Sequence, residues 1–90
     1  MPRYVIERTV PGVHRLNAEG LKNLSEASNK VLSELGPSIQ WMESYVTPDK
    51  LFCVYVAPSE DLIREHAKRG GFPVDRVTQV KTMIDPTTGE

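Results

Sequence analysis

Two β-rich runs joined by a short turn, Ile39–Thr47 and Lys50–Ala57, constrain the fold of this chain more than any other stretch. Both runs are rich in Trp, Tyr, Val, Phe and Ile, the side chains that fit the pleated and half-buried surface of a sheet. Between them, Pro48 fixes its own φ angle and Asp49 can hydrogen-bond to the local backbone, so a turn is favoured there. The stretch therefore predicts an antiparallel hairpin.

Side chains alternate between the two faces of a strand, and this predicts two different faces for the hairpin. In the second run, Phe52, Val54 and Val56 share a wholly apolar face, whereas Cys53 and Tyr55 lie on a mixed face. Strict alternation in the first run puts three side chains on one face: Trp41, Glu43 and Tyr45. We expect both faces to be covered, with Cys53 buried and the Trp41 indole partly buried and hydrogen-bonded.

Two helices are expected, one on each side of the hairpin in the sequence. Asn17 is a good N-cap for the first, and Gly36 followed by Pro37 ends it. Ser59 is in position to cap the second, which Gly70 and Gly71 end. Helical spacing gives the second helix an inward stripe of four residues: Leu62, Ile63, His66 and Ala67.

Two further strands are predicted near the ends of the chain, at Arg3–Val10 and Arg76–Ile84, followed by a polar tail at Asp85–Glu90. The order is therefore β-α-β-β-α-β over residues 1–90, which we interpret as a single domain. This is the ferredoxin-like arrangement of the α+β class. Right-handed crossovers would place both helices on one face of a four-stranded antiparallel sheet.

The other face of such a sheet is left without a cover. A large exposed apolar surface on a small protein usually marks a partner. At 90 residues the chain buries only about 60–65% of its unfolded surface, so a second subunit would also add core. We expect a homodimer in which two sheets pair face to face as a dimeric α+β barrel.

Composition excludes several classes of partner. Eleven basic and twelve acidic side chains give a net charge of −1, so there is no electrostatic reason to expect nucleic acid or an anionic membrane surface. No apolar run approaches the ~20 residues of a membrane-spanning helix, and the N-terminus lacks the pattern of a secretory signal. The single Cys53 fits a reducing compartment. We expect a cytoplasmic protein.

Three segments of the chain resemble a known family: PRYVIER, IQWMESYVTPDKLFCVYVAPSEDLIREHAKRGGFP and IDPTTGE. The family consists of small nickel-binding proteins, long described only as a domain of unknown function, with a ferredoxin-like fold and a dimeric α+β barrel. The resemblance implies the same fold, the same pairing and nickel as a bound ion. One departure is that Ser28 and Asn29 stand where many relatives have Ser-Cys, so this chain lacks a thiol there.

Glu7 and His66 are the two ionisable residues placed among apolar neighbours. A buried carboxylate needs a partner, and pairing with His66 would satisfy both groups. The pair could hold a divalent metal, act as an acid–base dyad, or form an orienting hydrogen bond. His66 alone could also be a hydrogen-bonded structural residue, and Glu7 could be solvated at a strand end. Glu7 and His66 are our candidate metal ligands.

A second candidate site is an aromatic-lined cavity on the mixed face, with Tyr45, Cys53 and Tyr55 as ligand-binding residues. Carboxylate, imidazole and thiolate donors suit nickel, but zinc or copper would be accepted as well. None of the strong metal, nucleotide or nucleophile motifs occurs, such as CxxC, HExxH, Walker A, GxGxxG or GxSxG.

Three classes of function stay open. The first is a small metal-binding protein that buffers or senses a divalent ion. The second is a cofactor-independent enzyme or ligand-binding dimer of the monooxygenase or isomerase type, in which His66 and Glu7 would move protons. The third is a dimerisation module without chemistry. Fold alone does not choose among them, because function resides in sites.

Overall fold

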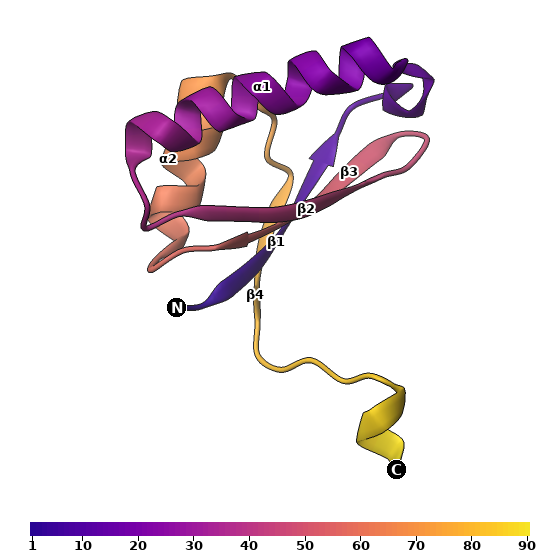
Figure 1. Ribbon diagram of the computed structural model, residues 1–90, viewed down its shortest axis with the longest axis vertical. Helices are drawn as coiled ribbons and strands as arrows, with labels where there is room; N and C mark the ends of the chain where they lie inside the picture. The colour runs from indigo at the N-terminus through magenta and orange to yellow at the C-terminus, as the bar shows by residue number, and fades with distance from the viewer.

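Four antiparallel strands form one sheet in the spatial order β2-β3-β1-β4. They are β1 (Arg3–Thr9), β2 (Gln40–Val46), β3 (Lys50–Val56) and β4 (Arg76–Val80). The computed structural model describes all of residues 1–90, and α1 and α2 lie on the same side of the sheet (Figure 1). This confirms the predicted ferredoxin-like α+β fold.

Helix α1 (Ala18–Leu35) begins where the sequence predicts. The Asn17 side chain accepts a hydrogen bond of 2.8 Å from the Gly20 backbone N–H, which satisfies one of the free donors of the first turn. Helix α2 (Glu60–Gly70) follows Ser59, whose side chain makes no capping bond. Gly71 ends α2 with a φ of 68°, a left-handed conformation that glycine adopts without steric cost. Neither helix combines the length and apolarity needed to cross a membrane.

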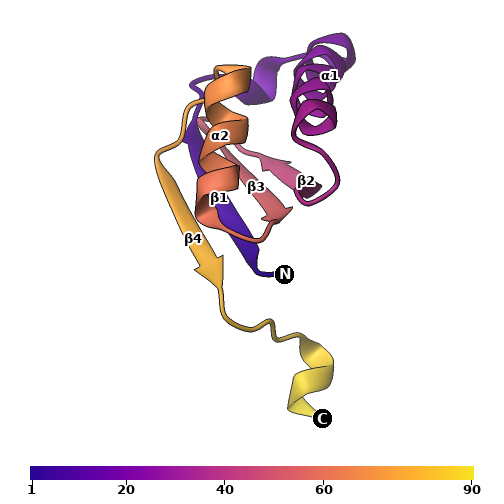
Figure 2. The ribbon, with the colours of Figure 1, turned by 90° about the vertical axis from the view of Figure 1, so that its left-hand side faces the viewer.

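The last strand is shorter than predicted. β4 ends at Val80, opposite Arg3, the first residue of β1. A continuation toward Ile84 would lie opposite Pro2, which has no backbone N–H to offer a ladder. The chain after Val80 instead leaves the sheet and ends in the short helix η2 (Pro86–Gly89), away from the body of the molecule (Figure 2).

The hydrophobic core lies between the sheet and the two helices. Alternate residues of β1 and β3 form its sheet side. Val13 and Ile63 belong to it from the side of the helices. Ile6 and Ile63 are completely buried. Fully burying one such side chain stabilises the fold by roughly 1.5–3 kcal/mol. Cys53 is buried as predicted, with 4% of its surface exposed.

A β-bulge in β2 changes the faces predicted for the hairpin. Trp41 is opposite Tyr55 but Glu43 is opposite Val54, so Met42 is an extra residue in β2. An extra residue moves every later side chain to the other face. Trp41 therefore faces the helices, while Glu43 and Tyr45 face away from them, and the prediction that these three share one face is wrong.

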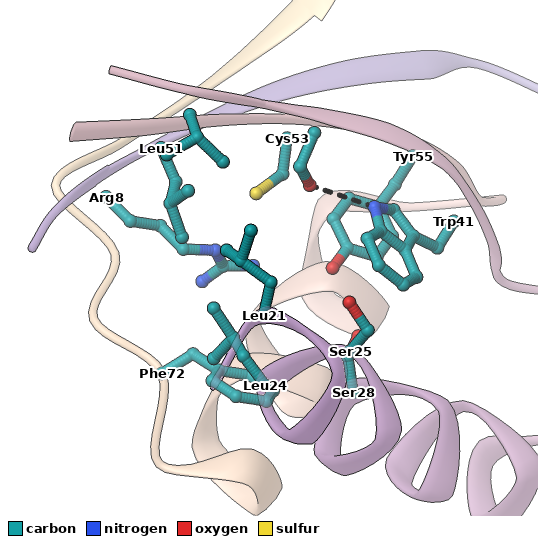
Figure 3. Close-up of a pocket in the computed structure, with 12 residues that line it drawn as sticks. Arg8, Leu21, Leu24, Ser25, Ser28, Trp41, Leu51, Cys53, Tyr55 and Phe72 are labelled. Carbon is teal, nitrogen blue, oxygen red and sulfur yellow. Dashed lines mark hydrogen bonds between the residues drawn. The ribbon is translucent and has the colours of Figure 1, made fainter. Parts of the chain in front are cut away.

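The Trp41 indole is half-buried, as predicted. Its N–H donates to the Ser44 hydroxyl at 2.9 Å, which connects the two sides of the bulge (Figure 3). The bulge therefore brings Trp41 and Ser44 to the same face of the sheet, under helix α1.

No helix covers the opposite face of the sheet. Strand register puts four half-buried apolar side chains on it: Val5, Phe52, Val54 and Val56. Tyr45 on the same face is 56% exposed. This surface, which we call the uncovered face, is the one expected from the order of the elements.

Candidate functional site

A cavity of about 250 Å³ lies between helix α1 and the half of the sheet formed by β2 and β3 (Figure 3). Eight of its twelve lining residues are hydrophobic. The remaining four are polar: Arg8, Ser25, Ser28 and Ser44. Val46, which also lines it, is 43% exposed, so the cavity opens to solvent. A concave, mainly apolar cavity with a few polar groups has the character of a small-molecule site.

Arg8 brings a positive charge to this cavity, although only 3% of its surface is exposed. It points to the same side of β1 as the core residues Tyr4 and Ile6, because alternate residues of a strand share a face. Its Nη1 donates to the Pro73 carbonyl at 2.8 Å, and its Cζ lies 5.6 Å from the centre of the Phe72 ring. Its Nη2 is buried and has no hydrogen-bond partner.

His66 lies on α2 beneath the same region and is completely buried. Its Nε2 is 3.2 Å from the Ser28 hydroxyl, and its ring packs 5.1 Å from Tyr55 and 5.4 Å from Phe72, measured between ring centres. Burial first, and then the positive charge of Arg8, lower the pKa of His66. The imidazole is therefore neutral at pH 7. Its Nδ1 has no partner.

The structure separates the two candidate metal ligands. Glu7 is opposite Phe52 on the uncovered face, with its carboxylate 3.6 Å from the Lys50 ammonium. His66 lies on α2, on the opposite side of the sheet from Glu7. The helices cover the Arg8 face of β1 and not the Glu7 face, so Glu7 is not a core residue, and the alternative of a partly solvated carboxylate is the one that agrees with its position. Within one chain, Glu7 and His66 form neither a metal site nor an acid–base pair.

The three candidate ligand-binding residues are also divided. Cys53 and Tyr55 both line the cavity, as the prediction of an aromatic-lined site requires. Tyr45 does not, because the bulge turns it to the uncovered face. There its hydroxyl donates to the Glu43 carboxylate, and that bond raises the pKa of the Tyr45 phenol. In the cavity, burial raises the pKa of Tyr55, so this phenol is neutral.

The side chains of one chain do not fit a nickel ion. No three His, Cys, Asp or Glu side chains come together anywhere in the structure. Cys53 is the one residue of these types that lines the cavity, and it shares the cavity with Arg8. A fixed guanidinium repels a divalent cation. The cavity therefore does not have the donors or the charge of a metal centre.

Sequence reasoning missed Arg8, Ser28 and Trp41 as residues of the site. A signal for Arg8 was available, because alternation groups it with the apolar Tyr4 and Ile6, and Glu7 with Val5 and Thr9. The more apolar side of a strand is the one that usually faces the core. Trp41 could not be assigned, because strict alternation fails at the bulge.

Comparison with known proteins identifies the family. Residues 4–80 match the model of the family described as nickel responsive protein SCO4226-like, and the chain therefore belongs to this family. Among solved structures, the crystal structure of SCO4226 from Streptomyces coelicolor A3(2) has the same fold, with a TM-score of 0.76. The two are 14% identical, over 91% of this chain and 99% of that chain. No curated protein matches the sequence.

Proposed function

We propose that this protein binds a divalent transition metal, nickel above all, as a cytoplasmic homodimer that buffers or senses the ion. The observation that carries the proposal is membership of a family described as nickel responsive, matched over residues 4–80. A single cysteine and the lack of any disulfide fit the reducing cytoplasm. A net charge of −1 gives no reason to add nucleic acid or a membrane surface as a partner.

The uncovered face supports the homodimer. Val5, Phe52, Val54 and Val56 form an apolar surface across its middle strands that two helices on the other side cannot cover. Two copies related by a two-fold axis would each bury this surface against the other. In the C-terminal tail, the side chains of Met83 and Ile84 are 68% and 76% exposed, which adds apolar surface for a partner.

A dimer would also supply the metal donors that one chain lacks. Glu7, Glu43 and Tyr45 lie on the uncovered face, and a two-fold axis would present each of them twice. Carboxylate and phenol oxygens are among the donors that divalent metal ions accept. His66 is buried on the other side of the sheet and does not belong to this set. We therefore keep Glu7 and not His66 as a proposed ligand.

Replacing Glu7 by Gln tests this assignment by calorimetric titration of untagged protein with nickel and with zinc. Outer-shell partners of metal ligands are already worth roughly 10–100-fold in affinity, so losing a direct ligand should weaken nickel binding at least roughly tenfold. The matched control is Glu34→Gln, a charge removal at an exposed position of α1, which should leave the affinity unchanged. Equal nickel affinity in the Glu7→Gln protein and the wild type would exclude this ligand set.

A further inference from the structure

We propose that the cavity between α1 and the β2–β3 half of the sheet is a binding site for a small organic carboxylate. The acid group would lie at Arg8 and the apolar body against the leucine and tryptophan side chains of the walls. The site is on the covered face, so it is independent of the metal proposed for the uncovered face.

The first observation is that Arg8 is buried with an incomplete set of hydrogen bonds. A guanidinium has five N–H donors, and here Nη1 is bonded to the Pro73 carbonyl while Nη2 has no partner. The guanidinium also packs over the Phe72 ring in a cation–π contact, but this contact accepts no hydrogen bond from its N–H donors. The unused edge belongs to a side chain that lines the cavity.

The second observation is that the protein provides no anion for this charge. The ion pairs of the chain join Lys22 to Glu26, Lys50 to Glu7, Arg64 to Glu60 and Arg69 to Glu65. None includes Arg8. A buried charge without a counter-ion destabilises the protein. An anionic ligand that paired with Arg8 would remove this unfavourable free energy, and the gain would favour its binding.

The charge of the cavity favours a carboxylate over a phosphate. Arg8 is the one cationic residue that lines it, and the nearby His66 imidazole is neutral. One guanidinium balances one negative charge, and its planar fork matches the two oxygens of a carboxylate. A phosphate dianion would keep a second charge without a partner between walls that are mainly apolar.

The walls determine the rest of the ligand. Leu21 and Leu24 of α1 and Leu51 of β3 lie close to the Arg8 guanidinium, whose charge also acts on the Tyr55 hydroxyl, and Trp41 lies at the other end (Figure 3). Ligand pockets are commonly roughly 300–1,000 Å³, so about 250 Å³ is suited to a single aromatic ring or a short alkyl chain. The class of ligand is thus an aromatic or short aliphatic monocarboxylate.

Fluorescence of Trp41, the only tryptophan of the chain, gives a direct readout because the indole lines the cavity. The probes are benzoate, phenylacetate and hexanoate, with benzyl alcohol as an uncharged match and inorganic phosphate as a different anion. We expect saturable changes in Trp41 fluorescence and a raised midpoint of thermal unfolding with the carboxylates. Benzyl alcohol and phosphate should give much weaker effects at equal concentration.

Arg8→Met removes the charge and keeps a long apolar side chain, and Arg8→Lys keeps the charge without the fork. We expect carboxylate affinity to fall at least about tenfold in Arg8→Met and by less in Arg8→Lys. Arg15→Met, at an exposed position of η1 (Val13–Arg15), is the matched control and should bind like the wild type. Nickel binding should be unchanged in all three variants.

The unliganded Arg8→Met protein should be as stable as the wild type or more so, because a buried charge without a counter-ion is removed. The proposal is overturned if none of the three carboxylates alters Trp41 fluorescence at millimolar concentration. It is also overturned if benzyl alcohol binds as tightly as benzoate, or if Arg8→Met retains wild-type affinity. A large loss of stability in Arg8→Met together with the absence of carboxylate binding would make Arg8 a structural clamp on the Pro73 carbonyl.

Discussion

Deletion of Met42 is expected to lower the free energy of unfolding by up to about 3–5 kcal/mol, the cost of truncating a well-packed tryptophan, because the half-buried Trp41 packs against the core. Met42 is the extra residue of the bulge, and without it β2 and β3 would pair one to one. Either Trp41 would then leave the covered face, or Glu43 and Tyr45 would turn toward α1. The Trp41–Ser44 hydrogen bond would be lost in both cases.

Met42→Ala is the control for this deletion. It keeps the bulge and shortens a side chain that is 48% exposed, so the change in stability should stay within about 0.5 kcal/mol. Urea unfolding followed by circular dichroism measures both variants. If the deletion left stability unchanged, the bulge would not determine which face of β2 the tryptophan takes.

Acid is expected to destabilise the protein through His66 before the carboxylates titrate. In the unfolded chain the pKa of this imidazole is about 6.5, and in the fold burial and the Arg8 charge lower it. Below pH ~6.5 the unfolded state therefore binds a proton that the folded state does not, and stability falls as the pH falls. One proton changes the free energy of unfolding by at most about 1.4 kcal/mol per pH unit.

Unfolding measured from pH 7.5 to pH 5 tests this, with His66→Phe as the comparison. Phenylalanine fills a similar ring-shaped space between Tyr55 and Phe72 but binds no proton. Its stability should change less over this range than that of the wild type. Arg8→Met should have an intermediate slope, because one of the two causes of the lowered pKa is gone. Equal slopes in the wild type and His66→Phe would contradict the assignment.

The elements of this fold could be predicted from local sequence because each has a local cause. Asn17 begins α1 and Gly36 ends it by interactions within a few residues. The end of β4 could not be predicted, since it depends on where β1 begins, seventy or more residues away in the sequence. The bulge at Met42 also has no local signal such as glycine, and it is visible only in the pairing with β3.

The candidate site was predicted in part for the same reason. Alternation separates Glu7 from Arg8, and the apolar Tyr4 and Ile6 beside Arg8 indicated the face of β1 that the helices cover, but this signal was not used. The sequence analysis therefore took Glu7 as the buried charged residue of β1, whereas the structure buries Arg8. Cys53 and Tyr55 were placed together correctly because β3 has no irregularity, whereas Tyr45 was misplaced because β2 has one.

Native mass spectrometry of untagged protein, with and without nickel, tests whether the protein is a nickel-binding homodimer. We expect a species of about 20 kDa, twice the chain mass of 10.1 kDa, that carries nickel and loses it when a chelator is added. Sedimentation equilibrium should give the same mass in solution. A 10.1 kDa monomer that takes up no nickel at micromolar protein concentration would contradict both the dimer and the metal.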